Sequence, residues 1–163
     1  MATWRPMTEN DIAGVMRVAD EIHRDLPEHE AVLRERLKLF PQGCMVLVDA
    51  EDVGGYVVSF PICRGKPPAL NDMLGEIPLD ADQYYLHDLA ILPRFRGRGA
   101  AAECVREILR VAGRYSTTCL ISVYGTVPFW GRFGFAPEVV DMGMEEKLRG
   151  YGADATYLTR QNT

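Results

Sequence analysis

Most residues whose types and spacing could do chemistry lie between positions 85 and 102. An apolar strand pattern there runs into a loop that holds Arg94, Arg96 and Arg98, and then into a helix pattern. Gly97 and Gly99 carry no Cβ, so the backbone N–H groups of this loop can approach a ligand closely. The N–H groups at the start of a helix are a ready site for phosphate. The segment therefore predicts a phosphate-binding loop.

One interpretation of this loop is a dinucleotide site, because Gly97-x-Gly99-x-x-Ala102 formally matches GxGxxG/A. A dinucleotide fold also needs an acidic residue about 20 positions later. That region instead holds Ser122 and Tyr124, and no P-loop motif is present. A nucleotide-binding oxidoreductase is therefore the weaker alternative.

Metal and thiol chemistry have little support from the four cysteines. No two of the cysteines form a CxxC pair, so the spacings usual for zinc sites and thioredoxin-like motifs are absent. Their apolar neighbours are typical of cysteines packed in a core. These residues are Cys44, Cys63, Cys104 and Cys119. We expect no metal site.

The elements that must position the loop are read from hydrophobic periodicity. The predicted helices are residues 12–22, 27–40, 99–113 and 128–133. The predicted strands are residues 45–48, 53–60, 84–92 and 118–124, with one or two more between 139 and 159. Helices and strands alternate without a repeat or linker, which predicts one α/β domain with a mixed sheet. The long loop 61–78 is typical of a lid or binding loop.

Composition narrows the class of partner. The chain has 163 residues, 47% hydrophobic and 25% charged, as in an average globular domain. It has 18 Lys and Arg against 23 Asp and Glu, a net charge of −5, which disfavours nucleic-acid binding. No signal peptide and no apolar run long enough for a bilayer are visible, so we expect a cytoplasmic protein without a membrane partner.

Two segments carry a family resemblance. Residues 96–101, Arg-Gly-Arg-Gly-Ala-Ala, resemble the R/Q-x-x-G-x-G/A acetyl-CoA pyrophosphate loop of the GNAT superfamily of N-acetyltransferases. Residues 127–135, Val-Pro-Phe-Trp-Gly-Arg-Phe-Gly-Phe, resemble the late F-Y-x-x-x-G-F segment of that family. The resemblance implies one N-acetyltransferase domain over residues 1–163. Its fold would be a mixed, mostly antiparallel sheet with a splayed central strand pair and flanking helices.

The resemblance also implies how acetyl-CoA binds. The strand residues would bind the pantetheine arm through their backbones, and the loop amides would hold the pyrophosphate. The residues assigned to the cofactor are Leu89, Ala90, Ile91, Arg96, Gly97, Arg98, Gly99, Ala100, Ala101, Ala102 and Trp130. The acceptor amine would attack the acetyl group directly, so that no cysteine is needed as a nucleophile.

Direct attack needs a base, and His87 is the first candidate because its ordinary pKa suits proton transfer near neutrality. The sequence resembles the aralkylamine N-acetyltransferases here, which carry a histidine at this strand position. Tyr85 lies two residues earlier and therefore on the same strand face. Asp88 faces the other way on a regular strand, and turns inward if the strand is bulged. The alternative for His87 is a histidine whose hydrogen bonds are satisfied within the sheet.

Trp130 departs from the family pattern, which usually has a tyrosine here that protonates the CoA thiolate. An indole N–H is far too weak an acid for that step. The acid then comes from Tyr124, our first choice, or from Tyr85, or the thiolate leaves without one. We expect Trp130 to pack against the cofactor or line the amine pocket, with a place in the core as the alternative.

The first two predicted helices often wall the acceptor site in this superfamily. Asp25, Glu28 and Glu30 could attract a cationic amine there, whereas His23 and His29 are expected to be surface histidines. The sequence therefore predicts transfer of acetyl from acetyl-CoA to a primary amine of a small molecule, peptide or protein.

The alternative is a non-catalytic acyl-CoA-binding or regulatory domain, which the loss of the usual acid favours. The oligomeric state stays open, with a homodimer as one option.

Overall fold

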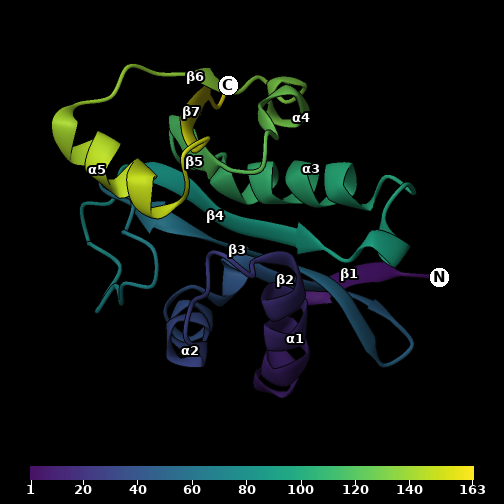
Figure 1. The fold of residues 1–163 in the computed structure, drawn as a ribbon. Coiled ribbons are helices and arrows are strands. Elements are labelled where there is room, and N and C mark those ends of the chain that lie inside the picture. The colour runs from purple at the N-terminus through teal and green to yellow at the C-terminus, as the bar shows by residue number, and fades with distance from the viewer.

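The computed structural model describes residues 1–163 and contains one mixed seven-stranded sheet, in the order β1-β2-β3-β4-β5-β7-β6 (Figure 1). Strands β1 to β4 form an antiparallel meander, β4 and β5 are parallel, and β5, β7 and β6 are antiparallel again. The strands are β1 Thr3–Pro6, β2 Cys44–Asp49, β3 Asp52–Ile62, β4 Gln83–Ile91, β5 Thr117–Ser122, β6 Ala136–Pro137 and β7 Thr156–Gln161.

Helices cover both faces of the sheet. Helices α1 and α2 lie on one face, and α3 and α4 lie on the other (Figure 1). The helices are α1 Ile12–Ile22, α2 Glu30–Leu39, α3 Ala100–Ala112, α4 Val127–Gly131 and α5 Met142–Gly150. A core of 24 buried residues packs against α1 and α2, and a second of 11 residues packs against α3 and α4. None of these helices is long and apolar enough to cross a membrane.

The predicted α/β architecture with a mixed sheet and a splayed central pair is confirmed. Two of the differences from the sequence prediction concern the surroundings of the site. Helix α2 begins at Glu30, and residues 23–29 form an irregular connection that carries Glu28 into the interior. The tail contributes β7 as predicted, but also the unpredicted helix α5, which the Asp141 side chain caps by accepting the N–H of Met144 at 2.8 Å.

The long loop between β3 and β4, residues 63–82, has no helix or strand but is fastened to its surroundings. Glu35 of α2 accepts the N–H groups of Leu74 and Gly75 at 2.6 and 2.9 Å. The hydroxyl of Tyr151, just after α5, donates to the carbonyl of Pro68 at 2.9 Å. Each of these bonds satisfies a loop backbone group, so the loop has a defined position over the end of the sheet.

Candidate active site

The sheet opens between its two central strands. Strands β4 and β5 pair only over Tyr84–Leu86 and Thr118–Leu120, and they diverge beyond Leu86. A cleft of about 480 Å³ lies in the gap. Leu89, Ala90 and Ile91 line it from β4, and Trp130 closes it from α4. The cleft therefore exposes the part of β4 to which sequence analysis assigned a cofactor arm.

The cleft continues into a second cavity, of about 310 Å³, beside the Arg- and Gly-rich loop. The two cavities share Ile91, Arg96, Ala101 and Phe129. The backbone N–H groups of residues 97–102 donate no hydrogen bond to any other group of the protein. Six free donors around the start of a 13-residue helix make a strong anion site.

Glycine conformation makes this loop possible. Gly97 and Gly99 have φ values of +82° and +76°, in the left-handed region that other residues rarely adopt. No atom lies within 4 Å of the position that a Cβ would take at either residue, so the loop surface is open. The arginines differ from one another. Arg96 donates to the carbonyl of Ile91 at 2.7 Å beside the cavity, whereas Arg94 stacks on Phe95 and points toward Asp52.

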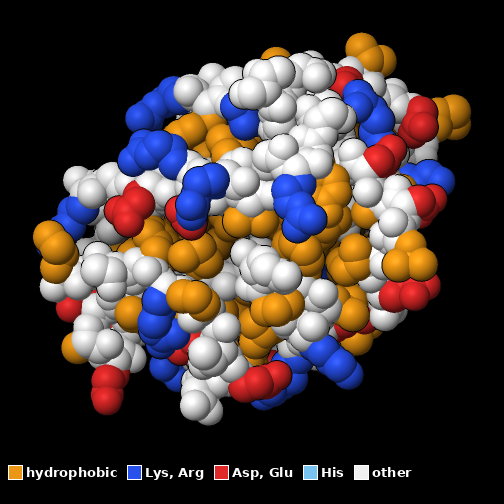
Figure 2. Space-filling view, turned by 180° about the vertical axis from the view of Figure 1, so that it is seen from behind, with side chains coloured by type: hydrophobic (Ala, Val, Ile, Leu, Met, Phe, Trp, Pro, Cys, Tyr) orange, Lys and Arg blue, Asp and Glu red, His pale blue; other side chains and the backbone are white.

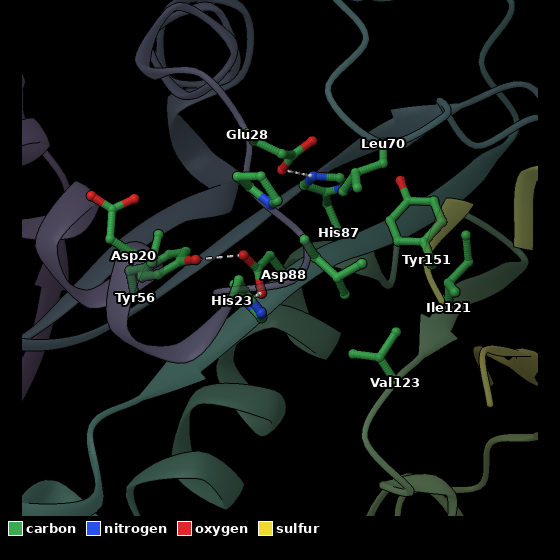
Figure 3. Close-up of a pocket in the computed structure, with 13 residues that line it drawn as sticks. Asp20, His23, Glu28, Tyr56, Leu70, His87, Asp88, Ile121, Val123 and Tyr151 are labelled. Atoms are coloured by element: carbon green, nitrogen blue, oxygen red, sulfur yellow. Dashed lines mark hydrogen bonds and ion pairs between the residues drawn. The ribbon is translucent and has the colours of Figure 1, made fainter. Parts of the chain in front are cut away.

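His87 lies at the inner end of the cleft, held in a chain of three side chains. Its Nε2 is 2.8 Å from Glu28 (Figure 3), and its Nδ1 is 3.3 Å from the Tyr85 hydroxyl. Its side chain is 3% exposed. Tyr85 and His87 thus share a strand face, as predicted, and both ring nitrogens of His87 have a partner.

A second series of hydrogen-bonded side chains includes Asp88, the residue next to His87. His23, the residue that ends α1, lies 2.8 Å from Asp88 through Nε2 and 3.0 Å from the Tyr124 hydroxyl through Nδ1. The other oxygen of Asp88 accepts from Tyr56 of β3 at 2.5 Å (Figure 3). The expectation that His23 is a surface residue was wrong, because its side chain is only 13% exposed.

An irregularity in β4 explains why neighbouring residues reach the same site. The β3–β4 register shifts between Val58 and Ser59, so that Asp88 pairs with Val58, Leu86 pairs with Ser59, and His87 has no partner. A bulge of this kind breaks the strict alternation of side chains. His87 and Asp88 consequently both line the cleft and the smaller pocket beside it. The conditional prediction for Asp88, an inward side chain if the strand is bulged, describes what is observed.

That smaller pocket, of about 50 Å³, lies on the α1 side of the cleft. Glu28 and Asp88 provide its carboxylates, and Leu26, Leu70 and Tyr151 give it an apolar wall. Leu70 belongs to the 63–82 loop, which therefore forms part of the wall of this pocket. The cleft and the pocket meet at His23, His87 and Asp88.

The charges of the two chains shift the pKa of their members. Burial would raise the pKa of Glu28, but His87 and the N–H of Asn71 outweigh it and lower this pKa from 4.5 to about 2. Burial would lower the pKa of His23, but the Asp88 carboxylate outweighs burial and raises it above 6.5. Burial and Asp88 together raise the pKa of Tyr124. At neutral pH, Glu28 is therefore ionised and His23 retains its proton more readily than a free histidine.

Trp130 is 8% exposed and packs edge-on against Phe129 and Phe135. It belongs to the second core and still forms part of the cleft wall, so that both sequence interpretations describe it. Sequence reasoning missed His23 and Tyr56. Only the position of His23 just after a predicted helix, close to several acidic residues, could have drawn attention to it.

An α/β sheet that opens beside a loop with free N–H groups defines the acyl-CoA-binding acyltransferase class. The sequence profile of the Acetyltransferase (GNAT) family matches residues 12–135, and the chain belongs to that family. No curated protein sequence matches the chain significantly.

Solved structures share the fold at low sequence identity. Ard1 from Thermoplasma volcanium is 18% identical, with a TM-score of 0.75 over 99% of this chain and 98% of that one. The loading GNATL domain of CurA from Lyngbya majuscula is 12% identical, with a TM-score of 0.80 over 99% and 98%. Arabidopsis thaliana Naa50, in complex with the bisubstrate analogue CoA-Ac-MVNAL, is 10% identical, with a TM-score of 0.68 over 98% and 97%.

Proposed function

We propose that the protein transfers the acetyl group of acetyl-CoA to a primary amine by direct attack in a ternary complex. The observation that carries the proposal is the continuity of the opened β4–β5 pair with the six free N–H groups of residues 97–102. An extended acyl thioester with a pyrophosphate at one end fits such a path. The CoA-containing analogue bound to Naa50, which has the same fold, supports this choice of cofactor.

In this proposal each wall of the cleft has a distinct task. The backbone of Leu89, Ala90 and Ile91 binds the pantetheine arm, and the residues from Gly97 to Ala102, with Arg96, hold the pyrophosphate. Trp130 supports the arm through apolar contact. An N–H group near Leu89 stabilises the negative charge that develops on the thioester oxygen.

The acceptor enters through the small pocket at the junction with the cleft. Glu28 and Asp88 attract its ammonium group. In the reactive form His87 is neutral with its proton on Nδ1, donated to the Tyr85 hydroxyl, so that Nε2 is free to take from Glu28 the proton that the amine must lose. Tyr85, behind His87, holds the ring through Nδ1. The neutral amine attacks the acetyl carbon, and Tyr124 protonates the departing thiolate. Because the pocket is only about 50 Å³ and the 63–82 loop forms part of its wall, compact amines fit better than the peptide part of the Naa50 analogue.

The test measures CoA release from acetyl-CoA with a panel of amines that includes small aliphatic and arylalkyl amines, amino acids and peptides. We expect turnover with at least one small amine and weaker activity with peptides. Acetyl-CoA binding without turnover on any amine would instead favour the non-catalytic acyl-CoA-binding alternative. Mass spectrometry of the product places the acetyl group on nitrogen and excludes simple thioester hydrolysis.

A further inference from the structure

One hydrogen-bonded chain in the site includes two residues, His23 and Tyr56, that have no task in the proposed mechanism. It runs from the Tyr124 hydroxyl through His23 to Asp88 and ends at Tyr56. Figure 3 shows the part from His23 to Tyr56. Its four members come from four different segments, namely the connection after α1, β3, β4 and the connection after β5. All three contacts are 3.0 Å or shorter, within hydrogen-bond distance.

The chain leads from the cleft into the protein interior. Tyr124 is 49% exposed and lines the cleft, whereas Tyr56 at the other end is 3% exposed. Tyr124 has a φ of +58°, a conformation that is strained for a bulky residue. Its ring stacks on His23 at a centroid distance of 5.7 Å and an interplanar angle of 18°. The stack and the hydrogen bond fix the position of its hydroxyl.

We propose that His23 positions Tyr124 and resupplies it with a proton, so that Tyr124 can protonate the CoA thiolate although the usual tyrosine is replaced by Trp130. This inference rests on the proposed function and deepens it. His23 acts through Tyr124 and does not touch the substrate. Asp88, fixed by the Tyr56 hydroxyl, orients the imidazole and stabilises its positive charge, as a carboxylate does behind many histidines.

Protons are balanced over one turnover. When the C–S bond breaks, the sulfur takes the Tyr124 proton, and the Tyr124 oxygen takes the Nδ1 proton of the His23 imidazolium. His23 is then neutral, with its Nε2–H still donated to Asp88. On its way from ammonium to amide the acceptor nitrogen loses two protons. One leaves to solvent by way of Glu28 and His87, and the other returns through solvent to His23, which replaces the proton that the thiol has carried away. The relay ends the cycle unchanged.

The charges around His23 favour its protonated form. The carboxylate of Asp88 opposes the effect of burial on the His23 pKa and raises it, with a smaller contribution from Glu28. The titratable groups that face the His23–Tyr124 pair are Asp20, Asp25, Glu28, Tyr56, His87, Asp88 and Asp154. Most are carboxyl groups, which favour the imidazolium form of His23 over the neutral form.

The first test compares the pH dependence of kcat for wild type, His23→Gln, Tyr124→Phe and the double variant. We expect each single variant to lose roughly 10- to 100-fold in kcat near neutrality, and the double variant to lose no more than the worse single one. The fall of wild-type kcat above the raised pKa of His23 disappears in His23→Gln. Acetyl-CoA Kd stays within a factor of two. His29→Gln and Tyr115→Phe are the matched controls and keep wild-type kcat.

The second test is independent of activity. The chain has only three histidines, so their imidazole ¹⁵N signals can be assigned by substitution and titrated. We expect His23 to titrate above 6.5 in the wild type and closer to 6.5 or below it in Asp88→Asn.

The outcomes separate this inference from the proposed function. Wild-type protein without turnover on any amine contradicts the proposed function itself. Wild-type turnover together with unchanged kcat and an unchanged alkaline limb in His23→Gln overturns the relay alone. If His23→Gln does not fold, a His23 pKa below 6.5 in the wild type, or wild-type kcat in Tyr124→Phe, overturns it equally.

Discussion

His87 and Glu28 form a hydrogen-bonded pair that other residues cannot readily replace. The His87 side chain is 3% exposed and the Glu28 side chain 20%, and their contact is 2.8 Å. Removing one partner of such a pair leaves the other in a poorly solvated position. The pair therefore sets both the charge of the acceptor pocket and the local stability of the site.

Replacing His87 by Ala should lower the rate of amine acetylation most strongly below pH 8. A free amine is scarce there, and the proton acceptor beyond Glu28 has been lost. Measuring kcat/KM from pH 6 to 9 with one amine tests this, and His29→Gln serves as the histidine control. Wild-type kcat/KM in His87→Ala at pH 7 would show that His87 is a structural residue only.

Glu28 should also make stability depend on pH. Its pKa is lowered from 4.5 to about 2 on folding, so its carboxylate stabilises the native state above pH 4.5, and this contribution is lost as pH falls toward 2. The free energy of unfolding of wild type minus that of Glu28→Gln should therefore decrease over this range. Urea unfolding at several pH values measures the difference. A constant difference would contradict the low pKa.

At this scale the sequence revealed residue types and local spacing but not long-range partners. Tyr85 and His87 were correctly placed on one face because they are two positions apart on a strand. His23 was misjudged because its partner Asp88 is 65 positions away. No local pattern around a histidine reports whether a carboxylate from another element will reach it.

At the scale of elements, the bulge in β4 and the 63–82 loop together shape the acceptor side of the site. The bulge brings adjacent residues to the same site, and the loop adds Leu70 to the pocket wall. Neither feature follows from hydrophobic periodicity. A bulge depends on the register with a neighbouring strand, and an irregular loop has no period to detect.

Weakening the attachment of this loop should change acceptor binding and leave cofactor binding intact. In Glu35→Gln, one carboxylate oxygen that accepts the N–H of Leu74 or Gly75 is replaced by an amide NH₂, which cannot accept. We expect faster hydrogen exchange at these two amides and a several-fold higher KM for the amine. Acetyl-CoA Kd should stay unchanged.

Glu30→Gln is the matched control for that change, because Glu30 lies on the same helix and pairs only with exposed Arg34. Equal exchange rates in Glu35→Gln and Glu30→Gln would show that the loop is held by its other contacts.

Element prediction succeeded where the amphipathic pattern was strong, as in α1 and α3. It failed for α5, of which Met144 is the one buried residue, so no apolar stripe marks it as a helix. It also missed β1, which has four residues and a mostly exposed face. Short or exposed elements depend on tertiary pairing that single-sequence patterns do not contain.

At the scale of the whole molecule, the protein combines net negative charge with a local anion site. On the face seen in Figure 2, Lys and Arg side chains are interspersed with Asp, Glu and apolar side chains and form no single large patch. The net charge is −5. Affinity for a polyphosphate must therefore come from the free N–H groups and neighbouring arginines, and not from the overall field.

Acetyl-CoA should accordingly raise the melting temperature, since a ligand at about 100 times its Kd adds about 2.7 kcal/mol to stability. Arg96→Glu should reduce this rise in melting temperature and weaken acetyl-CoA binding by more than about 1 kcal/mol. A hydrogen bond to a charged group contributes about 1.5–3 kcal/mol. Arg94→Glu, in which the replaced arginine faces Asp52, should have a smaller effect. Differential scanning fluorimetry tests both, and stabilisation by NAD instead of acetyl-CoA would revive the dinucleotide interpretation.

The short β4–β5 ladder also has a mechanical consequence. It contains three residue pairs, against six between β5 and β7, and it is the join between the β1–β4 meander and the strands that follow. Under a pulling force applied across that join, the sheet should part there first. A ligand that contacts both β4 and α4 would link the two parts of the sheet while it is bound. The force needed to separate them should then be higher when the cleft is occupied.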